Sequence, residues 1–349
     1  MRKICLSLVA TVLAALTAEV AHAADTRVEQ IRQRLENANQ WRDHVMVVAH
    51  RGGGVAAGRS LYPENSVAAV RASIALGVEM VELDIQRSSD GQFVVFHDSW
   101  LDRSSTCRGE LRLRTLAELR QCRLVIEATG KATDEAIPTF AEMLAVTRGH
   151  MFINVDNKLE PADLPAIVAV ARGMDMADQL VVKANIWNDD RIARLKDVLS
   201  TVGAGPIFMP IVADDAVRGA QFLETVTAAF SASAAELVAW HQPGQPMTAD
   251  GGPLFTTGAR AVAARGDWHM WVNTYAIVNK PAGMLSGGRG DQLATTASLP
   301  REAFGFWVDR GATIIQTDEP KAAIDWLDAG GLRVPYRDGE ATAALTPSN

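Results

Sequence analysis

The chain has 349 residues and a formal net charge of −7; 48% of its residues are apolar and 21% are charged, which is the balance of a packed globular protein. Disordered and fibrous chains are therefore excluded. Lysines and arginines are scattered along the chain and form no block. A nucleic-acid partner is not expected, because binding along a phosphate backbone requires a basic stripe.

The first 23 residues predict a secretory signal peptide that is cleaved after Ala23. Arg2 and Lys3 form a positively charged start, an apolar run follows, and small residues precede the predicted cleavage site. The run is too short to span a membrane, so we expect no stable membrane insertion. Residues 24–349 are expected to form one domain that is secreted to the bacterial periplasm. A buried N-terminal helix is the alternative for residues 1–23.

The chain has three cysteines, too few for a disulfide scaffold and without the spacing of a zinc site. Cys5 lies in the predicted signal peptide, which leaves Cys107 and Cys122 in the mature chain. In an oxidising compartment we expect these two to pair. Two independent buried thiols are the alternative.

Eight short apolar runs recur along the mature chain, and most precede a helical pattern. They cover residues 45–49, 79–85, 151–156, 180–184, 207–212, 236–240, 270–274 and 312–316. The near-constant spacing of the middle runs indicates βα units, and eight such units predict an α/β fold, the (β/α)8 TIM barrel. An open doubly wound sheet is the alternative, although no Gly-x-Gly-x-x-Gly fingerprint follows a strand.

A hairpin is expected after the second strand. Asp90-Gly91 lies between that strand and a further apolar run at 93–97, which is a strong signal for a two-residue turn. With such a turn, Asp84 faces His97 across the hairpin, on one face of the sheet.

Polar residues gather at the predicted carboxyl ends of the strands, the end at which TIM barrels carry their catalytic groups. Glu82 and Asp84 project to one face, because alternate residues of a strand do so. The other strand-end groups are His50 and Arg51, His97 and Asp98, Asn154, Asp156 and Lys158, and Thr317 and Asp318. Each of these residues alone has a non-functional explanation, such as a solvated edge strand or an exposed lysine. Their concentration at strand ends in separate segments of the chain favours a functional site.

The chemistry of these groups suits phosphodiester cleavage. The carboxylates of Glu82, Asp84 and Asp156 are hard ligands for a divalent metal, Ca²⁺ or Mg²⁺, with Mn²⁺ also suitable. The two histidines titrate near neutrality and can transfer protons. Arg51 can bind a phosphate through two parallel hydrogen bonds, and Lys158 can add a point charge.

The runs AHRGG, YPENS, VELDIQRSSDGQFVVFHD, SWLDRSSTCRGELRLRTLAELR, IPTFAEML, INVDNK and GATIIQTDEP resemble the glycerophosphodiester phosphodiesterase family. The resemblance covers about 45–158 in detail and resumes at 311–320. It implies a TIM barrel that hydrolyses glycerophosphodiesters to glycerol phosphate and an alcohol, using a divalent metal. It also implies that the segment 98–137 is the insertion that caps the site and helps to select the alcohol.

The resemblance implies a role for each matching residue. It assigns His50 and His97 to the catalytic pair and Arg51 to phosphate binding. The metal ligands are Glu82, Asp84 and Asp156, and Lys158 matches the lysine that follows the third ligand in the family. Glu64 and Asn65 match the Pro-Glu-Asn motif, which lines the same pocket as these residues. The sequence departs from the family pattern in four places. Asp156 replaces the usual Glu, the loop 53–62 is longer and glycine-rich, and Trp271 is displaced by one position. The Ser-Phe that often ends the middle strand is absent from 181–184.

We therefore expect a secreted, metal-dependent phosphodiesterase that acts on a small-molecule phosphodiester. In this scheme His50 activates the attacking oxygen and His97 protonates the leaving alkoxide, although the two labels are interchangeable on sequence alone. One alternative is a phospholipase D that acts on lysophospholipids or, like a sphingomyelinase D, on sphingolipids. A second alternative is a non-catalytic secreted protein that binds phosphate or metal; a proton-transfer pair of histidines argues against it.

Overall fold

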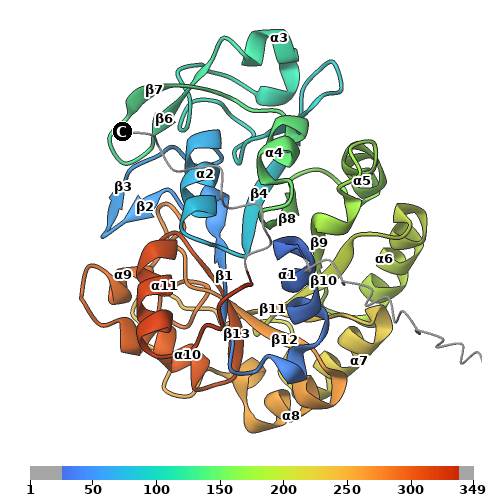
Figure 1. Cartoon of the computed structure of the whole chain (residues 1–349), viewed down its shortest axis with the longest axis vertical. Helices are drawn as coiled ribbons and strands as arrows, with labels where there is room; N and C mark the ends of the chain where they lie inside the picture. Colours follow the sequence, from blue (N-terminus) through green and yellow to red (C-terminus); the bar gives the residue numbers. More distant parts are fainter. Residues whose placement is uncertain (1–25, 338–349) are drawn as a thin grey trace, which may run out of the picture.

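The computed structural model describes residues 26–337, and its main sheet is a closed barrel of eight parallel strands (Figure 1). The barrel strands are β1 (Met46–Ala49), β4 (Met80–Arg87), β8 (Phe152–Asn157), β9 (Leu180–Asn185), β10 (Ile207–Ala213), β11 (Ala234–Val238), β12 (His269–Asn273) and β13 (Ala312–Thr317). β1 pairs with both β13 and β4, which closes the barrel. The predicted (β/α)8 fold is confirmed, and the open sheet is excluded. The predicted signal peptide lies outside the described residues.

Helices surround the strands (Figure 1). They are α2 (Val67–Ala75), α4 (Phe140–Thr147), α5 (Leu164–Arg172), α6 (Asp189–Val202), α7 (Ala220–Phe230), α8 (Thr257–Gly266), α9 (Asp291–Ala294), α10 (Phe306–Val308) and α11 (Pro320–Ala329). Side-chain caps fix several of their starts. Thr139 and Glu142 form a capping box at α4, and Asn188 caps α6. No helix among residues 26–337 is long and apolar enough to cross a membrane.

Helix α1 (Arg27–Glu36) covers the amino-terminal end of the barrel and was not predicted from the sequence. Its buried Ile31 and Leu35 pack against side chains of the barrel interior. Thr26 and Glu29 form a capping box at its start, which is the signal that could have revealed it.

Each predicted strand lies within two residues of its expected bounds. The largest shift is at β11, which begins at Ala234 and not at residue 236. Ala234 and Ala235 have low strand propensity but are buried against neighbouring strands, so packing decides their conformation.

The hairpin formed by β4 and β5 (Phe93–Val95) has a different register from the predicted one. Ile85 pairs with Val95 and Arg87 with Phe93, so the loop is one residue longer than a two-residue turn. Gly91 adopts a left-handed conformation at φ +82°, as in a three-residue loop that closes with a bulge. The backbone carbonyl of Asp84 accepts from Phe96, and the prediction that Asp84 directly faces His97 was wrong.

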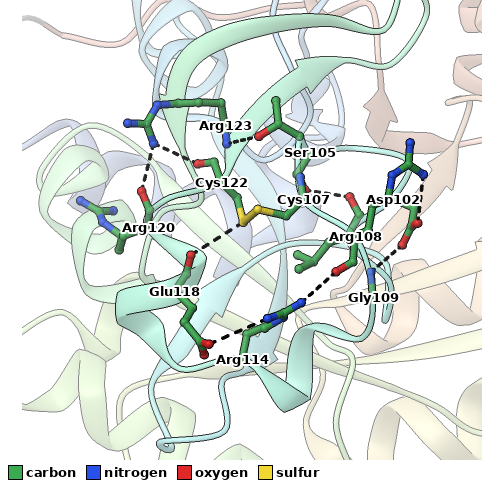
Figure 2. Close-up of a disulfide and its surroundings, with 12 residues drawn as sticks. Asp102, Ser105, Cys107, Arg108, Gly109, Arg114, Glu118, Arg120, Cys122 and Arg123 are labelled. Atoms are coloured by element: carbon green, nitrogen blue, oxygen red, sulfur yellow. Dashed lines mark hydrogen bonds and ion pairs between the residues drawn. A yellow bond between two sulfur atoms is a disulfide. The ribbon is translucent and has the colours of Figure 1, made fainter.

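The chain between β5 and α4 forms an insertion that projects from one side of the barrel and carries α3 (Leu116–Leu119), β6 (Arg123–Ile126) and β7 (Lys131–Ala136) (Figure 1). It has a small core of its own, which includes Leu101, Leu111 and Leu124. Cys107 and Cys122 form a disulfide across it, with Cα atoms 5.4 Å apart (Figure 2). Closing a loop of this length stabilises a fold by about 3 kcal/mol in the chain-entropy account.

Buried His269 of β12 joins the barrel to α1. Its Nε2 lies 2.9 Å from the backbone oxygen of Arg34 and its Nδ1 lies 2.8 Å from Thr313 Oγ1. A neutral ring satisfies both contacts, with Nε2–H donating to the carbonyl and Nδ1 accepting from the hydroxyl. Burial lowers the pKa of His269 to about 4.

We predict that His269 makes the folded state less stable at acidic pH. The imidazole of His269 takes up a proton near pH 6.5 in the unfolded state and only near pH 4 in the folded state. Above pH 6.5 the ring is neutral in both states, so the stability that the neutral ring contributes is fully present there. As pH falls from 6.5 to 4, about 3 kcal/mol of unfolding free energy should be lost. Urea unfolding across this range should show a shallower pH dependence for His269→Gln. The exposed-residue control His150→Gln should match the wild type; equal slopes in all three would contradict the prediction.

Candidate active site

The inward-facing side chains of the barrel change from apolar to polar toward the carboxyl ends of the strands. On β4, Val81 and Leu83 belong to the outer core beneath the helices, whereas Met80 packs inside the barrel. Alternation along the strand therefore directs Glu82 and Asp84 inward, and both are buried. The same alternation directs Asp156, Lys183, Glu236 and Asn273 into this layer from β8, β9, β11 and β12.

Glu82, Asp84 and Asp156 come together as the sequence predicted. Each offers an oxygen atom, and these atoms lie within 4.8 Å of one another. The register of β4 and β8 sets Asp84 directly beside Asp156. Buried Glu82 Oε1 has no hydrogen-bond partner among residues 26–337, and burial, with the nearby charge of Asp84, raises the pKa of Glu82 well above its usual value. A cluster of hard oxygen donors with an unpartnered atom fits a divalent cation.

Two lysines balance this negative charge. Lys158 Nζ lies 2.9 Å from Asp84 Oδ1 and 3.2 Å from Asp156 Oδ2. Lys183 Nζ lies 3.7 Å from Asp156 Oδ2 and 3.3 Å from Glu236 Oε2. Burial raises the pKa of Asp84, but the charges of Lys158 and then Arg51 outweigh burial, so the net pKa is lowered.

Lys183 and Glu236 were missed in the sequence analysis. Lys183 lies in the strand where the family's Ser-Phe is absent. Alternation along β9 from the inward Val181 is the signal that would have placed Lys183 inside the barrel.

Arg51, Glu64 and Asn65 hold the cluster from its side. Arg51 has a left-handed backbone at φ 49°, and its guanidinium lies 2.9 Å from Glu64 Oε2 and 3.3 Å from Asp84 Oδ2. Asn65 Nδ2 donates to Asp84 Oδ2 at 2.7 Å. The Pro-Glu-Asn motif thus orients both the arginine and a candidate metal ligand.

His50 is buried beside the cluster. Its Nδ1 lies 2.7 Å from Asp318 Oδ1, its ring stacks on Tyr275 at 3.5 Å, and its Nε2 lies 4.0 Å from Glu82 Oε2. Burial and then the charge of Arg51 lower the pKa of His50 well below its usual value, so the ring is neutral at pH 7. Its Nδ1–H then donates to Asp318, which leaves Nε2 as a proton acceptor facing the carboxylates.

His97 lies near the cluster, where it contributes to the lowered pKa of Asp84 after burial, Lys158 and Arg51. Its Nδ1 lies 2.6 Å from Asp98 Oδ1. Arg103 of the insertion holds Asp98 with Nε at 2.7 Å and also pairs with Glu64. The sequence analysis missed Arg103, and no local pattern marks it.

Trp271 lies inside the barrel and is fully buried. Its Nε1 donates to Asn273 Oδ1 at 2.8 Å, and Asn273 Nδ2 donates to Glu236 Oε1 at 2.6 Å. The displaced tryptophan therefore supports the floor of the polar layer.

The fold and the site define a (β/α)8 barrel with a carboxylate cluster and two histidines at the carboxyl ends of its strands. Residues 50–200 match the model of the Glycerophosphoryl diester phosphodiesterase family, and residues 208–327 match the model of a domain of unknown function. The resemblance found in the sequence motifs is therefore confirmed over the first of these ranges.

Curated relatives match the same part of the chain. A glycerophosphodiester phosphodiesterase of Caldanaerobacter subterraneus subsp. tengcongensis is 33% identical over 114 residues, which are 32% of this chain and 45% of that protein. Glycerophosphodiester phosphodiesterase 1 of Homo sapiens is 36% identical over 111 residues, which are 31% of this chain and 32% of that protein. The chain thus spans less than half the length of these two relatives.

Solved structures share the fold over most of the chain. A glycerophosphoryl diester phosphodiesterase of Parabacteroides distasonis is 18% identical, with a TM-score of 0.62 over 91% of this chain and 96% of that one. A phosphodiesterase of Oleispira antarctica, solved in complex with the product sn-glycerol-3-phosphate, is 18% identical, with a TM-score of 0.54 over 81% of this chain and 96% of that one.

We predict that a divalent cation binds to the three carboxylates. Calorimetric titration with Ca²⁺, Mg²⁺ and Mn²⁺ should show one site for at least one ion, with an affinity that rises with pH because Glu82 must lose its proton. Glu82→Gln and Asp156→Asn should each weaken binding at least about 10-fold. Glu224→Gln, which changes an exposed carboxylate paired with Arg265, is the matched control. Wild-type affinity in both cluster variants would place the ion elsewhere.

Proposed function

We propose that the protein hydrolyses glycerophosphodiesters to glycerol phosphate and an alcohol, in a metal-dependent reaction with two histidines. One observation carries the proposal: His50, Arg51 and Lys158 lie against the carboxylate cluster, and His97 is near enough to act electrostatically on Asp84. Hard oxygen donors, cations for a phosphate and two proton-transfer groups are the parts that phosphodiester cleavage requires.

The residues that would hold the metal are Glu82, Asp84 and Asp156. When bound, a divalent ion supplies Lewis-acid stabilisation of negative charge on a phosphoryl oxygen. Arg51 and Lys158 then neutralise the remaining phosphate charge, each released in part from its present carboxylate partner. Ca²⁺, Mg²⁺ and Mn²⁺ all suit this set of ligands.

The two histidines transfer protons on either side of the phosphate. His50 is neutral and held in one tautomer by Asp318, so its Nε2 can accept a proton. His97 is held through Nδ1 by Asp98, which Arg103 fixes in turn. We assign proton abstraction to His50 and protonation of the leaving oxygen to His97.

We further propose that the protein is secreted to the periplasm. The charge and composition of residues 1–23 support this, and so does the Cys107–Cys122 disulfide, since such bonds persist in oxidising compartments.

The purified protein should hydrolyse glycerophosphodiesters, and EDTA should abolish turnover until a divalent metal is restored. The measurement is release of glycerol phosphate from glycerophosphocholine and glycerophosphoethanolamine, with lysophosphatidylcholine in parallel. His97→Ala should lower kcat at least about 100-fold, because a positioned proton donor contributes that much. Faster turnover of lysophosphatidylcholine would favour the phospholipase D alternative. Turnover of none would favour a binding protein, and insensitivity to EDTA would contradict the metal.

Asp318→Asn should lower kcat about 100-fold or more with little change in KM. The amide can donate to Nδ1 of His50 and so favour the tautomer with its proton on Nε2, which cannot act as the base. Asp325→Asn, which alters an exposed carboxylate paired with Lys321, should retain wild-type kinetics. Wild-type kcat in Asp318→Asn would show that Asp318 does not orient His50.

A further inference from the structure

A cavity of about 430 Å³ opens beside the candidate active site. It shares His50, Arg51 and Glu64 with the site and contains none of the three candidate metal ligands. Its other walls are the loop that carries β2 (Val55–Ala56) and β3 (Arg59–Ser60), the segment 276–296 and part of the insertion. We call it the acidic cavity, because five carboxylates line it: Glu64, Glu127, Asp291, Asp318 and Glu319.

Three of these carboxylates lack a cationic partner. Glu64 pairs with Arg51 and Arg103, and Asp318 contacts His50. Among residues 26–337, no lysine, arginine or histidine forms an ion pair with the other three, which are Glu127, Asp291 and Glu319. Burial and then neighbouring carboxylates raise the pKa of Glu127 and of Asp291 to about 7. These two carboxyls are therefore only partly ionised at pH 7, and a cation bound beside them would favour their charged form.

Glu319 has an unused hydrogen-bond acceptor. It is 2% exposed and lies at the start of α11, and its Oε1 accepts from the backbone of Gly58 at 2.5 Å. Its buried Oε2 has no hydrogen-bond partner in the described part of the chain. The hydroxyl of Thr295, the nearest side-chain donor to Glu319, also donates to the Asp291 carbonyl at 3.0 Å, and its single hydrogen cannot serve both acceptors fully.

Gln292 adds a second buried acceptor without a partner, its Oε1, to the same cavity. A buried acceptor without a donor is costly, so these atoms indicate a ligand that brings hydrogen-bond donors.

We propose that the acidic cavity binds the alcohol substituent of the substrate and selects an alcohol that carries a primary ammonium group, with Glu319 as the specificity-determining residue. The proposal rests on the proposed phosphodiesterase function. A primary ammonium supplies both the positive charge that the carboxylates lack and the N–H donors that Glu319 and Gln292 lack. A quaternary ammonium has the charge without donors, and a polyol has donors without the charge. A cavity of this volume accommodates a small alcohol.

The test compares two diesters that differ at one group. Glycerophosphoethanolamine and the glycerophosphodiester of 1-propanol have alcohols of equal length, and a methyl group replaces the ammonium in the second. For the metal-loaded wild type, we expect kcat/KM to be at least about 10-fold higher for the ammonium substrate, the effect of one charge-assisted hydrogen bond. The kcat/KM for glycerophosphocholine should be lower than that for glycerophosphoethanolamine. Equal kcat/KM for the ethanolamine and propanol diesters would overturn the proposal.

Variants then test which residues cause the preference for the ammonium substrate. Glu319→Gln should reduce the ratio of the two kcat/KM values about 10-fold, because it removes the charge and keeps the size of the side chain. Glu127→Gln, which changes a cavity residue of the insertion, should reduce the ratio in the same direction and serves if Glu319→Gln does not fold. Glu224→Gln is the control outside the cavity and should keep the wild-type ratio. A wild-type ratio in folded Glu319→Gln would overturn the assignment of Glu319.

A binding measurement separates this proposal from the proposed function. Titration calorimetry or ligand-observed NMR with free ethanolamine, and with 1-propanol as the neutral probe, needs no turnover. Binding of ethanolamine that is stronger than that of 1-propanol and is weakened in Glu319→Gln supports the cavity even if no diester is hydrolysed. Turnover of the diesters without any preference for ethanolamine in either assay would overturn the cavity proposal and leave the phosphodiesterase function standing.

Discussion

The structure depends on a balance of charges buried inside the barrel. Four carboxylates and three cations meet in one layer above an apolar floor: Glu82, Asp84, Asp156 and Glu236 with Arg51, Lys158 and Lys183. Isolated charges at such depth are too costly to keep, so each sign requires the other. Lys158 and Lys183 keep Asp156 paired, and Lys158 and Arg51 keep Asp84 paired. A divalent ion bound to these carboxylates would replace part of the positive charge of the lysines. The lysines therefore keep the carboxylates together at a place where a cation can bind.

The histidines and the insertion are attached to this layer through hydrogen bonds and further ion pairs. Asp318 fixes one ring, and Asp98 fixes the other. Arg103 joins Asp98 to Glu64 and so connects the insertion to the loop that carries the Pro-Glu-Asn motif. Cys107, one half of the disulfide in Figure 2, lies four residues after Arg103 in the sequence, so the bond restrains the segment that carries this arginine. The insertion thus contributes a side chain to the site.

Much of the fold was predictable because its signals are local. Strand runs bounded by turn residues, the Thr139–Glu142 capping box and the Asn188 cap are properties of short segments. The hairpin register failed because one sequence, Asp90-Gly91, fits both a two-residue turn and a three-residue loop. Lys183 and Glu236 were missed because alternation along a strand shows which residues share a face but not which of the two faces lines the barrel interior with Asp156.

The sequence by itself determined the eight strands, the polar residues at their ends and the motifs of the phosphodiesterase family. It also determined which residues of each strand share a face, since the strand period is two. Only the tertiary structure decided which faces meet: Asp84 beside Asp156, Asp318 on His50, and Arg103 between Glu64 and Asp98. The acidic cavity also belongs to the tertiary structure, because Glu127, Asp291 and Glu319 come from segments far apart in the chain. The physical reason is that barrel closure and strand register are set by packing over the whole chain, and no short segment carries that information.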